Sequence, residues 1–306
     1  MKLLAAPLQG FTEAPWRNLH HELFGGIDTY YTPFVRLERG EFRRRDVRDI
    51  EPARNTVPHL VPQLIAATPA ELDAVAGLFV EQGYAEADLN LGCPFPLLTG
   101  KHKGAGILPH PEEVKALLTE MKRHPDLRFS VKMRLGLVDA DEWKSLLPLL
   151  NEAPLQRITL HPRIGKQQYK GQVHLEVFAA FYEQCQHPLV YNGDLRTLED
   201  MERMAARFPR VEGLMLGRGL LAQPSLAVEF QEGRAWTAEE RLQRVLQLHD
   251  RLLQHYEACL QGDAQLLAKL KPFWEYLLPE ADHKAKKAIH KATSLNKYRA
   301  AVRLLG

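Results

Sequence analysis

Cysteine is scarce in this chain. Its three cysteines, Cys93, Cys185 and Cys259, are odd in number, far apart, and never arranged as CxxC. A disulfide framework needs even numbers, and a zinc site usually groups its thiolates closely in the sequence. We therefore predict neither, and expect reduced thiols and no metal centre.

Long apolar runs and low-complexity tracts are missing as well. No stretch approaches the roughly 20 apolar residues that cross a bilayer, and residues 1–10 lack the basic start and apolar core of an export signal. With 45% hydrophobic and 25% charged residues, the composition is that of a globular protein rather than a disordered one. We expect a cytoplasmic protein without a membrane partner, acting as a monomer.

Excess positive charge is confined to one end. The formal net charge is only +2, but residues 264–306 hold nine lysines and arginines against three acids. This asymmetry has two interpretations, a surface for a polyanion or a solvated helix face rich in lysine.

Apolar, β-branched segments recur eight times, with helical patterns between them. Residues 69–83 place Leu72, Val75, Ala76 and Phe79 on one helix face, and a second amphipathic pattern follows Pro111. The candidate strands end near Leu8, Val35, Ala66, Asn90, Arg134, His161, Asn192 and Gly217. Steps of 24 to 44 residues match one strand and one helix each.

Eight such units predict an α/β fold of the (β/α)8 TIM-barrel type over residues 1–235. From Thr237 onward only helical patterns remain, beginning with a long amphipathic segment. We therefore predict a small helical bundle domain over residues 236–306, joined to the barrel near residues 233–236.

Polar side chains gather where the predicted strands end, which is the active-site face of such a barrel. Lys132 shares a strand face with Ser130 and Arg134, and His161 follows the next strand. A polar face on a strand that is covered on both sides is costly unless it lines the mouth. For Lys132 and His161 a site role is favoured, whereas Gln63 and Asn90 are equally compatible with tying down a loop.

The last two predicted strands end in patterns that suit an anion. One is followed by Asn192, Gly193 and Asp194, the other by Gly217 and Arg218 ahead of a helix. Glycine backbone, a helix start and a guanidinium favour a phosphate, although an ordinary turn and a surface arginine remain the alternative. Together with Lys132 and His161 they predict flavin mononucleotide (FMN) across the mouth.

Cys93 lies between Gly92 and Pro94, where the alternating run of residues 87–91 stops. A thiol at this position is either a small apolar filler or a reagent. Opposite a flavin hydride it would be a suitable proton donor.

Seven strings identify a family. APLQGFTEAPWR, NLGCP, GAGIL, VKMRLG, HPRIGKQQYKG, NGD and LGRGLLAQP stand in this order along nearly the whole chain. They resemble the signatures of the tRNA dihydrouridine synthases, and TPFVR with LKPFWEYL is similar to the bacterial subgroup acting on the early side of the D-loop. The resemblance implies reduction of a tRNA uridine to 5,6-dihydrouridine, with NADPH as electron donor and a C-terminal helical domain that holds tRNA.

The resemblance also implies roles for individual residues. Cys93 becomes the acid that protonates carbon 5 of the base. Cofactor contacts are implied for Pro7, Leu8, Gln9, Gln63, Lys132, His161, Asn192, Gly193, Asp194, Gly217 and Arg218. Asn90 and Arg134 would hold the base or a nearby phosphate. Residues 99–110 read as a mobile lid meeting RNA or as a plain connector. Expected RNA contacts are Arg36, Lys101, Lys103, Lys284, Lys286 and Lys287.

Two departures from the family pattern affect the cofactor. His161-Pro162-Arg163-Ile164 stands where His-Gly-Arg-Thr is typical, so the backbone loses a donor at Pro162. Leu8 and Gln9 replace the usual methionine-led pair, which alters packing beneath a flavin without abolishing its binding.

Three alternatives stay open. Residues 36–54 hold seven arginines and five acids, which suit either a tRNA contact or a self-paired surface network. A barrel reductase acting on a free pyrimidine, similar to dihydroorotate dehydrogenase, would need the same hydride and proton. A non-catalytic tRNA-binding protein of this fold would lack flavin.

Overall fold

The core of the protein is a sheet of parallel strands, seen in a computed structural model that describes residues 1–305. Each neighbouring pair in this sheet is parallel. In spatial order the strands are β5 (Leu60–Val61), β2 (Thr29–Tyr31), β1 (Lys2–Ala5), β11 (Gly213–Leu216), β10 (Leu189–Tyr191), β9 (Arg157–Ile164), β8 (Arg128–Gly136), β7 (Glu86–Leu91) and β6 (Gln63–Leu64).

The sheet closes on itself at Pro62. The first and last strands of the order, β5 and β6, are consecutive in the chain and separated by that proline alone. Proline has no N–H to donate, so the ladder is interrupted there, but its carbonyl still accepts from the Asp88 N–H at 3.0 Å. Residues 60–64 are thus one barrel strand, and the predicted (β/α)8 fold is confirmed.

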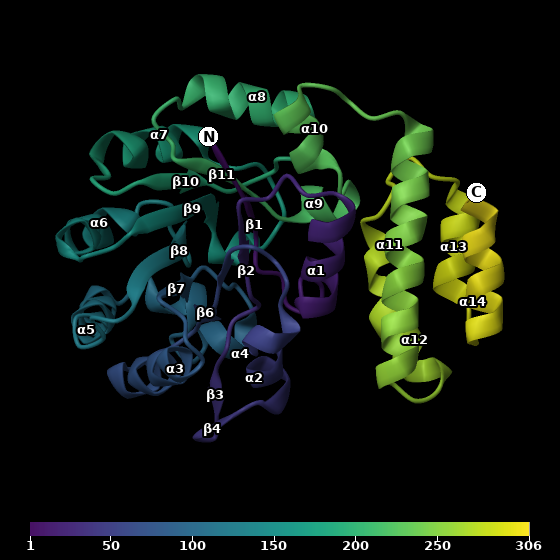
Figure 1. Cartoon of the computed structure of the whole chain (residues 1–306). Coiled ribbons are helices and arrows are strands. Elements are labelled where there is room, and N and C mark those ends of the chain that lie inside the picture. Colours follow the sequence, from purple (N-terminus) through teal and green to yellow (C-terminus); the bar gives the residue numbers. More distant parts are fainter. Residues whose placement is uncertain (306) are drawn as a thin grey trace.

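Helices cover the outside of this barrel (Figure 1). In α3 the Thr68 side chain caps the helix start at the Glu71 N–H, 3.3 Å away. The four apolar residues predicted for its inner face are fully buried. The outer helices are α1 (Ala14–Leu23), α3 (Pro69–Glu81), α5 (Pro111–Met121), α6 (Trp143–Glu152), α7 (Leu175–Gln184), α8 (Leu198–Arg207) and α10 (Leu226–Glu232).

After residue 237 the chain is helical and lies beside the barrel, on the right in Figure 1. At its centre the Tyr298 hydroxyl accepts from Trp274 Nε1 at 2.7 Å and lies 2.9 Å from His249 Nε2. Lys269 of this part pairs with Glu13 of the barrel at 2.6 Å. The helices are α11 (Ala238–Cys259), α12 (Asp263–Leu270), α13 (His283–Lys291) and α14 (Leu295–Val302).

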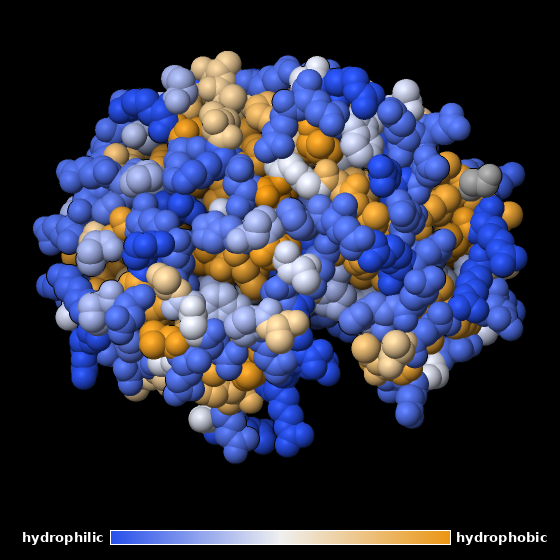
Figure 2. Space-filling model, viewed as in Figure 1, coloured by the Kyte–Doolittle hydropathy of each residue, from blue (hydrophilic) through white to orange (hydrophobic). Residues whose placement is uncertain are grey.

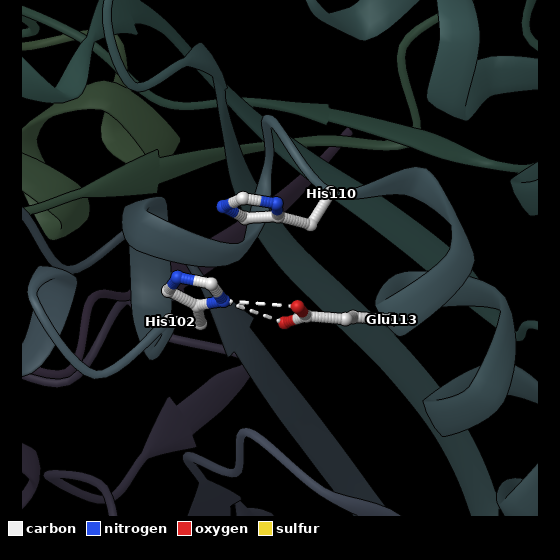
Figure 3. Close-up of side chains that lie close together, drawn as sticks. All are labelled: His102, His110 and Glu113. Carbon is white, nitrogen blue, oxygen red and sulfur yellow. Dashed lines mark hydrogen bonds and ion pairs between the residues drawn. The ribbon is translucent and has the colours of Figure 1, made fainter.

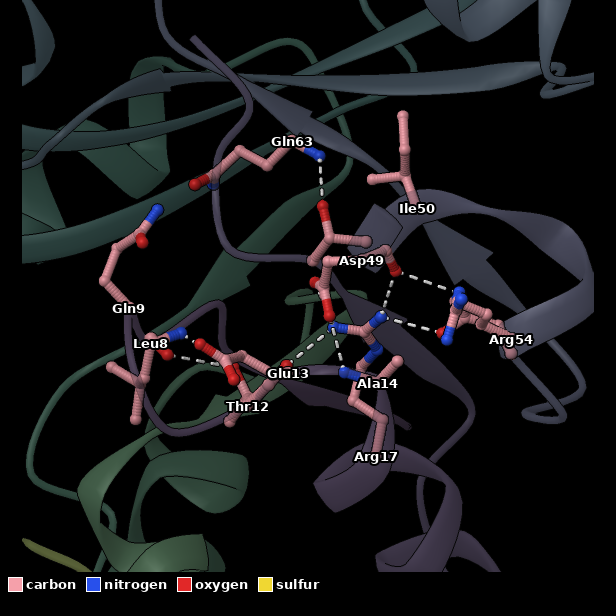
Figure 4. Close-up of polar contacts among 12 residues, drawn as sticks. Leu8, Gln9, Thr12, Glu13, Ala14, Arg17, Asp49, Ile50, Arg54 and Gln63 are labelled. Carbon is pink, nitrogen blue, oxygen red and sulfur yellow. Dashed lines mark hydrogen bonds and ion pairs between the residues drawn. The ribbon is translucent and has the colours of Figure 1, made fainter. Parts of the chain in front are cut away.

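The arginine-rich segment after β2 is anchored by a buried cation (Figure 4). Arg17 is fully buried and donates to the Thr12 carbonyl at 2.7 Å, to the Asp49 carboxylate at 2.9 Å and to the Asn55 side chain at 2.7 Å. Its guanidinium therefore ties α1 to the segment at several points. This segment comprises β3 (Leu37–Glu38), β4 (Glu41–Phe42), α2 (Arg44–Ile50) and the single turn η1 (Pro52–Arg54).

Short helical turns complete the chain. They are α4 (Pro96–Thr99), η2 (Gly104–Ile107), η3 (Gly165–Gln167), α9 (Arg218–Ala222), η4 (Lys271–Glu275) and η5 (Arg303–Leu305). Within residues 1–305, none of the helices has both the length and the apolar character needed to cross a membrane.

Candidate active site

A cavity opens at the carboxyl ends of the barrel strands, where residues from seven of them converge. Cys93 and ten of the eleven residues expected to contact the cofactor line this cavity. Asn90 and Arg134, which were expected to hold the uracil base, line it as well. These are Pro7, Leu8, Gln9, Asn90, Cys93, Lys132, Arg134, His161, Asn192, Gly193, Asp194, Gly217 and Arg218. Residues from distant parts of the sequence thus share one site.

Cys93 follows β7 and is held through its main chain. Its N–H donates to the Asn90 side-chain oxygen at 2.8 Å, and its carbonyl accepts from the Ala105 N–H at 2.9 Å. Burial raises the pKa of the Cys93 thiol, although Arg134 and other cations act in the opposite direction. At neutral pH the sulfur therefore keeps its proton, as a proton donor must.

Lys132 of β8 brings a cation to the cavity floor. Its ammonium donates to the Asn192 side-chain oxygen at 2.8 Å, and Asn192 in turn donates to the Met215 carbonyl at 2.7 Å. Burial, aided by the positive charge of Arg134, lowers the pKa of Lys132 to about 8. The Lys132 side chain is thus mostly charged at neutral pH, but its pKa lies only slightly above that pH.

His161 of β9 supplies a neutral ring. Burial and the surrounding cations, Arg134 foremost, hold the pKa of His161 well below its usual value. Its Nε2 lies 3.2 Å from Nη1 of Arg163, and a guanidinium can only donate. Nε2 therefore accepts, which leaves the proton of the neutral ring on Nδ1.

Two guanidiniums share one carboxylate at the far side of the cavity. Arg163 is almost fully buried and pairs with Asp194 through both terminal nitrogens, while Arg218 donates to Asp194 at 2.9 Å. Burial opposes the charge of Asp194, yet Arg163 and Arg218 hold its pKa below the usual value. Arg196 also approaches Asp194, at 3.9 Å, so three cations against one anion leave a net positive corner.

Tyr169 covers this corner, and the sequence reasoning did not single it out. Its ring is 46% exposed and lies 4.5 Å from the Arg218 guanidinium carbon and 5.4 Å from that of Arg134. It also stacks on His161 with ring centroids 6.3 Å apart. It belongs to an irregular loop without any periodicity, so only its place within HPRIGKQQYKG could have marked it.

Arg134 is more constrained than a simple ligand-binding arginine. Its guanidinium donates to the carbonyls of Gly92 and Ile164, each at 2.9 Å, while the side chain is almost entirely buried. It therefore joins the loop of Cys93 to the end of β9. Gln63 is fully buried and is not among the lining residues, and its side chain bonds to Asp88 and Asn90.

The segment of residues 99–110 is packed against the barrel rather than poised as a lid. Every residue of η2 is buried, and the Lys103 ammonium pairs with Glu71 at 2.7 Å while the residue is only 7% exposed. The expectation that Lys103 meets RNA is therefore wrong, because its charge is buried and neutralised. Lys101 remains exposed.

A second contact fixes this segment to α5 (Figure 3). The His102 Nδ1 lies 2.9 Å from both carboxylate oxygens of Glu113, and the His110 ring stacks on His102 at 3.9 Å with an angle of 11°. Two histidines and a carboxylate could in principle bind a metal ion. The lone pair of an imidazole lies in the plane of its ring, however, so two stacked parallel rings direct their lone pairs in parallel planes and not toward one shared ion. We therefore interpret the contact between His102, His110 and Glu113 as a structural one, which holds the segment against α5.

The lysines of α13 divide into two kinds. Lys284 and Lys287 are exposed, whereas the Lys286 ammonium donates to the carbonyls of Leu277 and Leu278 at 3.0 and 3.3 Å. The Lys286 ammonium thus serves the main chain just after η4, so we expect it to contribute less to RNA binding than its two exposed neighbours.

A recess separates the arginine-rich segment from the C-terminal helices, visible at the lower edge of Figure 2. Gln9 lines both this recess and the barrel cavity, so the two adjoin. Arg45, Arg48, Arg54, His255 and Lys269 line it as well. Arg36 lies outside both and is 3.5 Å from Glu38. Several of the arginines pair with acids of the same segment.

Comparison with known proteins identifies relatives of this chain. The tRNA-dihydrouridine synthase B of Klebsiella pneumoniae is 28% identical over 235 residues, 75% of this chain and 71% of that protein. The tRNA-dihydrouridine(16) synthase of Pseudomonas putida is 29% identical over 281 residues, 89% of this chain and 85% of that protein. The fold is similar to that of morphinone reductase in complex with tetrahydroNAD, with a TM-score of 0.54 and 10% identity, covering 77% of this chain and 88% of that one.

The family model described as dihydrouridine synthase (Dus) matches residues 3–298. That range includes both the barrel and almost all of the C-terminal helices. The chain belongs to the dihydrouridine synthase family.

Proposed function

We propose that this protein reduces uridine 16 of tRNA to 5,6-dihydrouridine, with FMN as the hydride carrier and NADPH as the electron donor. One observation carries the proposal: a protonated thiol, a buried ammonium and a positively charged corner line the same cavity of a dihydrouridine synthase. A tRNA substrate would place the reaction in the cytoplasm.

The polar groups of the cavity suit a phosphorylated flavin. Arg218, beside Arg163, would meet the phosphate, and Lys132 would lie near the pyrimidine edge, where a cation stabilises negative charge. His161, with its proton on Nδ1, would serve as a neutral hydrogen-bond partner. Further contacts are proposed for Pro7, Leu8, Gln9, Asn192, Gly193, Asp194 and Gly217. The contact expected of Gln63 is not proposed, because its amide is buried and bonded at both ends within the protein. When bound, FMN would supply the hydride for carbon 6 of the base.

Cys93 would complete the reduction by giving its proton to carbon 5. Uracil is a conjugated ring, so hydride at one carbon must be matched by a proton at the next. The raised pKa of the thiol keeps that proton in place at neutral pH. Asn90 and Arg134 would hold the base, which has to leave the RNA stack to enter the cavity.

We propose two domains, a catalytic barrel over residues 1–235 and a tRNA-binding helical domain over residues 236–306. Exposed Lys284 and Lys287 give the second part positive charge, and the recess beside it adjoins the cavity. Position 16 is favoured because similarity to the Pseudomonas putida synthase extends over 281 residues, compared with 235 for the synthase B relative. The longer match takes in helices that would orient the tRNA.

The test is to map dihydrouridine in tRNA from a strain that lacks this protein. We expect position 16 alone to revert to uridine, and to regain dihydrouridine when the gene is restored. Loss at another position would refute the assignment of position 16, and no loss would refute the activity in that organism. Purified protein should be yellow and should turn over unmodified tRNA. A preference for free uridine would instead favour a free-pyrimidine reductase.

A further inference from the structure

A fully buried carboxylate lies beneath the active site, and the proposed chemistry does not use it. Asp88 points inward from β7 and is 0% exposed. One of its oxygens accepts from Gln63 Nε2 at 2.7 Å, and the other accepts from the Ser130 hydroxyl at 2.6 Å. Burial raises the pKa of Asp88, while the hydrogen bonds from Gln63 and Ser130 and the charges of Lys132 and Arg157 act in the opposite direction. A fully buried carboxyl group is costly even when it is hydrogen-bonded, so its retention requires a reason.

Hydrogen bonds run from Asp88 to the main chain of Cys93. The Gln63 side-chain oxygen accepts from Asn90 Nδ2 at 2.8 Å. The Asn90 side-chain oxygen then accepts from the N–H groups of Gly92 and Cys93, at 3.0 and 2.8 Å. Three side chains from two neighbouring strands thus connect the buried carboxylate with the loop that carries the sulfur.

The direction of this chain is fixed by chemistry. The main-chain N–H groups of Gly92 and Cys93 can only donate, so the oxygen of the Asn90 amide faces them and its nitrogen faces Gln63. The Gln63 amide must then turn its oxygen to Asn90 and its nitrogen to Asp88. One oxygen of Asp88 therefore accepts from Gln63, and this follows from the main-chain end alone. Reversing either amide would oppose two donors or two acceptors in a buried place.

We propose that Asp88 is a positioning residue for dihydrouridine formation, which, through Gln63 and Asn90, holds the main chain of Cys93 where the sulfur reaches the base. This inference rests on the proposed function. Proton transfer requires approach to within hydrogen-bond distance, and an error of about 1 Å can cost about 10²-fold in rate. Asp88 itself touches neither cofactor nor substrate in this arrangement.

Asp88→Ala is the variant that breaks the chain at its buried end. We expect single-turnover oxidation of the reduced flavin by tRNA to slow about tenfold or more, because the Cys93 loop loses its anchor. Flavin content and the rate of flavin reduction by NADPH should stay within about twofold of wild type. Asp88→Asn should recover most of the rate, since its oxygen can accept from Gln63 while its amide donates to Ser130.

A double-mutant cycle separates positioning from a general structural effect. On a Cys93→Ala background, Asp88→Ala should slow the residual reaction by less than about twofold, because a group that acts through the thiol has nothing left to position. Glu229→Ala is the matched control: it removes another fully buried carboxylate, which pairs with Arg241 away from the cavity. It should lower stability and leave the single-turnover rate unchanged.

The inference is overturned if the rate losses of Asp88→Ala and Cys93→Ala multiply in the double variant. It is also overturned if Asp88→Asn is as slow as Asp88→Ala, or if the flavin content of Asp88→Ala falls in parallel with its single-turnover rate. Should Asp88→Ala fail to fold, Gln63→Met breaks the same chain at similar volume, and the same comparison with Cys93→Ala decides. Wild-type protein that forms no dihydrouridine would refute the proposed function. Wild-type activity that Asp88→Ala leaves intact would refute only the role of Asp88.

Discussion

The protein carries positive charge in two regions, and they differ in how that charge is held. At the barrel mouth Lys132, Arg134 and Arg163 are buried or partly buried and fixed by hydrogen bonds to side chains or carbonyls. On α13 Lys284 and Lys287 are exposed, and neither side chain is part of an ion pair or hydrogen bond within residues 1–305.

The difference teaches what each region is suited to bind. Burial lowers the pKa of Lys132 and of Arg134, so these two charges have a cost that a ligand of fixed shape can offset. Hydrated lysines on a helix have no such cost and no fixed geometry. They suit a long, flexible polyanion that is bound by many weak contacts.

The largest effect is expected from removing the Cys93 thiol at the barrel mouth. Cys93→Ala should lower dihydrouridine formation by about 10²-fold or more, the usual weight of general acid catalysis. Flavin content and reduction by NADPH should persist, since the thiol serves neither. Single-turnover assays with unmodified tRNA measure the loss, and a rate equal to that of wild type would remove Cys93 from the chemistry.

The next largest effect is a loss of FMN affinity when a cation is removed from the barrel mouth. Arg218→Ala should weaken FMN binding by about 10- to 100-fold, since a charge-assisted hydrogen bond contributes about 1.5–3 kcal/mol. Fluorescence titration of the apoprotein with FMN measures it. The matched comparison is the triple variant Lys284→Gln, Lys287→Gln and Lys291→Gln, which should bind FMN like wild type. Equal weakening in both proteins would erase the distinction between the regions.

A pH profile tests whether the buried ammonium matters. Because the pKa of Lys132 is lowered to about 8, the side chain is charged below that pH and loses its charge above it. We expect kcat/KM to fall about tenfold per pH unit above pH 8. In Lys132→Arg this fall of kcat/KM above pH 8 should disappear, because a guanidinium stays charged at that pH. If the fall persists in the variant, it reports the titration of another group.

The smallest effect is expected from the exposed lysines. The triple variant should bind tRNA several-fold more weakly, and the salt dependence of binding should flatten by roughly 0.7–0.9 in slope for each phosphate that is no longer neutralised. Lys286→Gln is the control on the same helix, since its ammonium serves the carbonyls of Leu277 and Leu278. It should leave the slope unchanged. A slope that changes in the control and not in the triple variant would reverse the assignment.

The sequence predicted the barrel and most of its mouth because strand ends follow a simple rule. Once eight parallel strands are recognised, Lys132, His161 and Arg218 must meet at one face whatever their separation in the chain. The helix predicted over residues 69–83 is confirmed for a similar reason, since its apolar period and Thr68 are local signals.

Pairing between distant segments could not be predicted in this way. Nothing near Lys103 in the sequence indicates that Glu71 will meet it, and nothing near Lys286 marks the carbonyls that it serves. Asp88 looks like an ordinary polar residue of an alternating strand until the register places it beside Ser130. Such contacts depend on tertiary packing, which local patterns do not encode.

The turn at Gly104 constrains how this enzyme can diverge. A Cβ atom there would lie 2.6 Å from the Cys93 carbonyl oxygen, and its φ of +60° is one that other residues rarely adopt. A side chain at position 104 would therefore push against the main chain that carries the sulfur, so this turn requires glycine whatever residue stands at position 93.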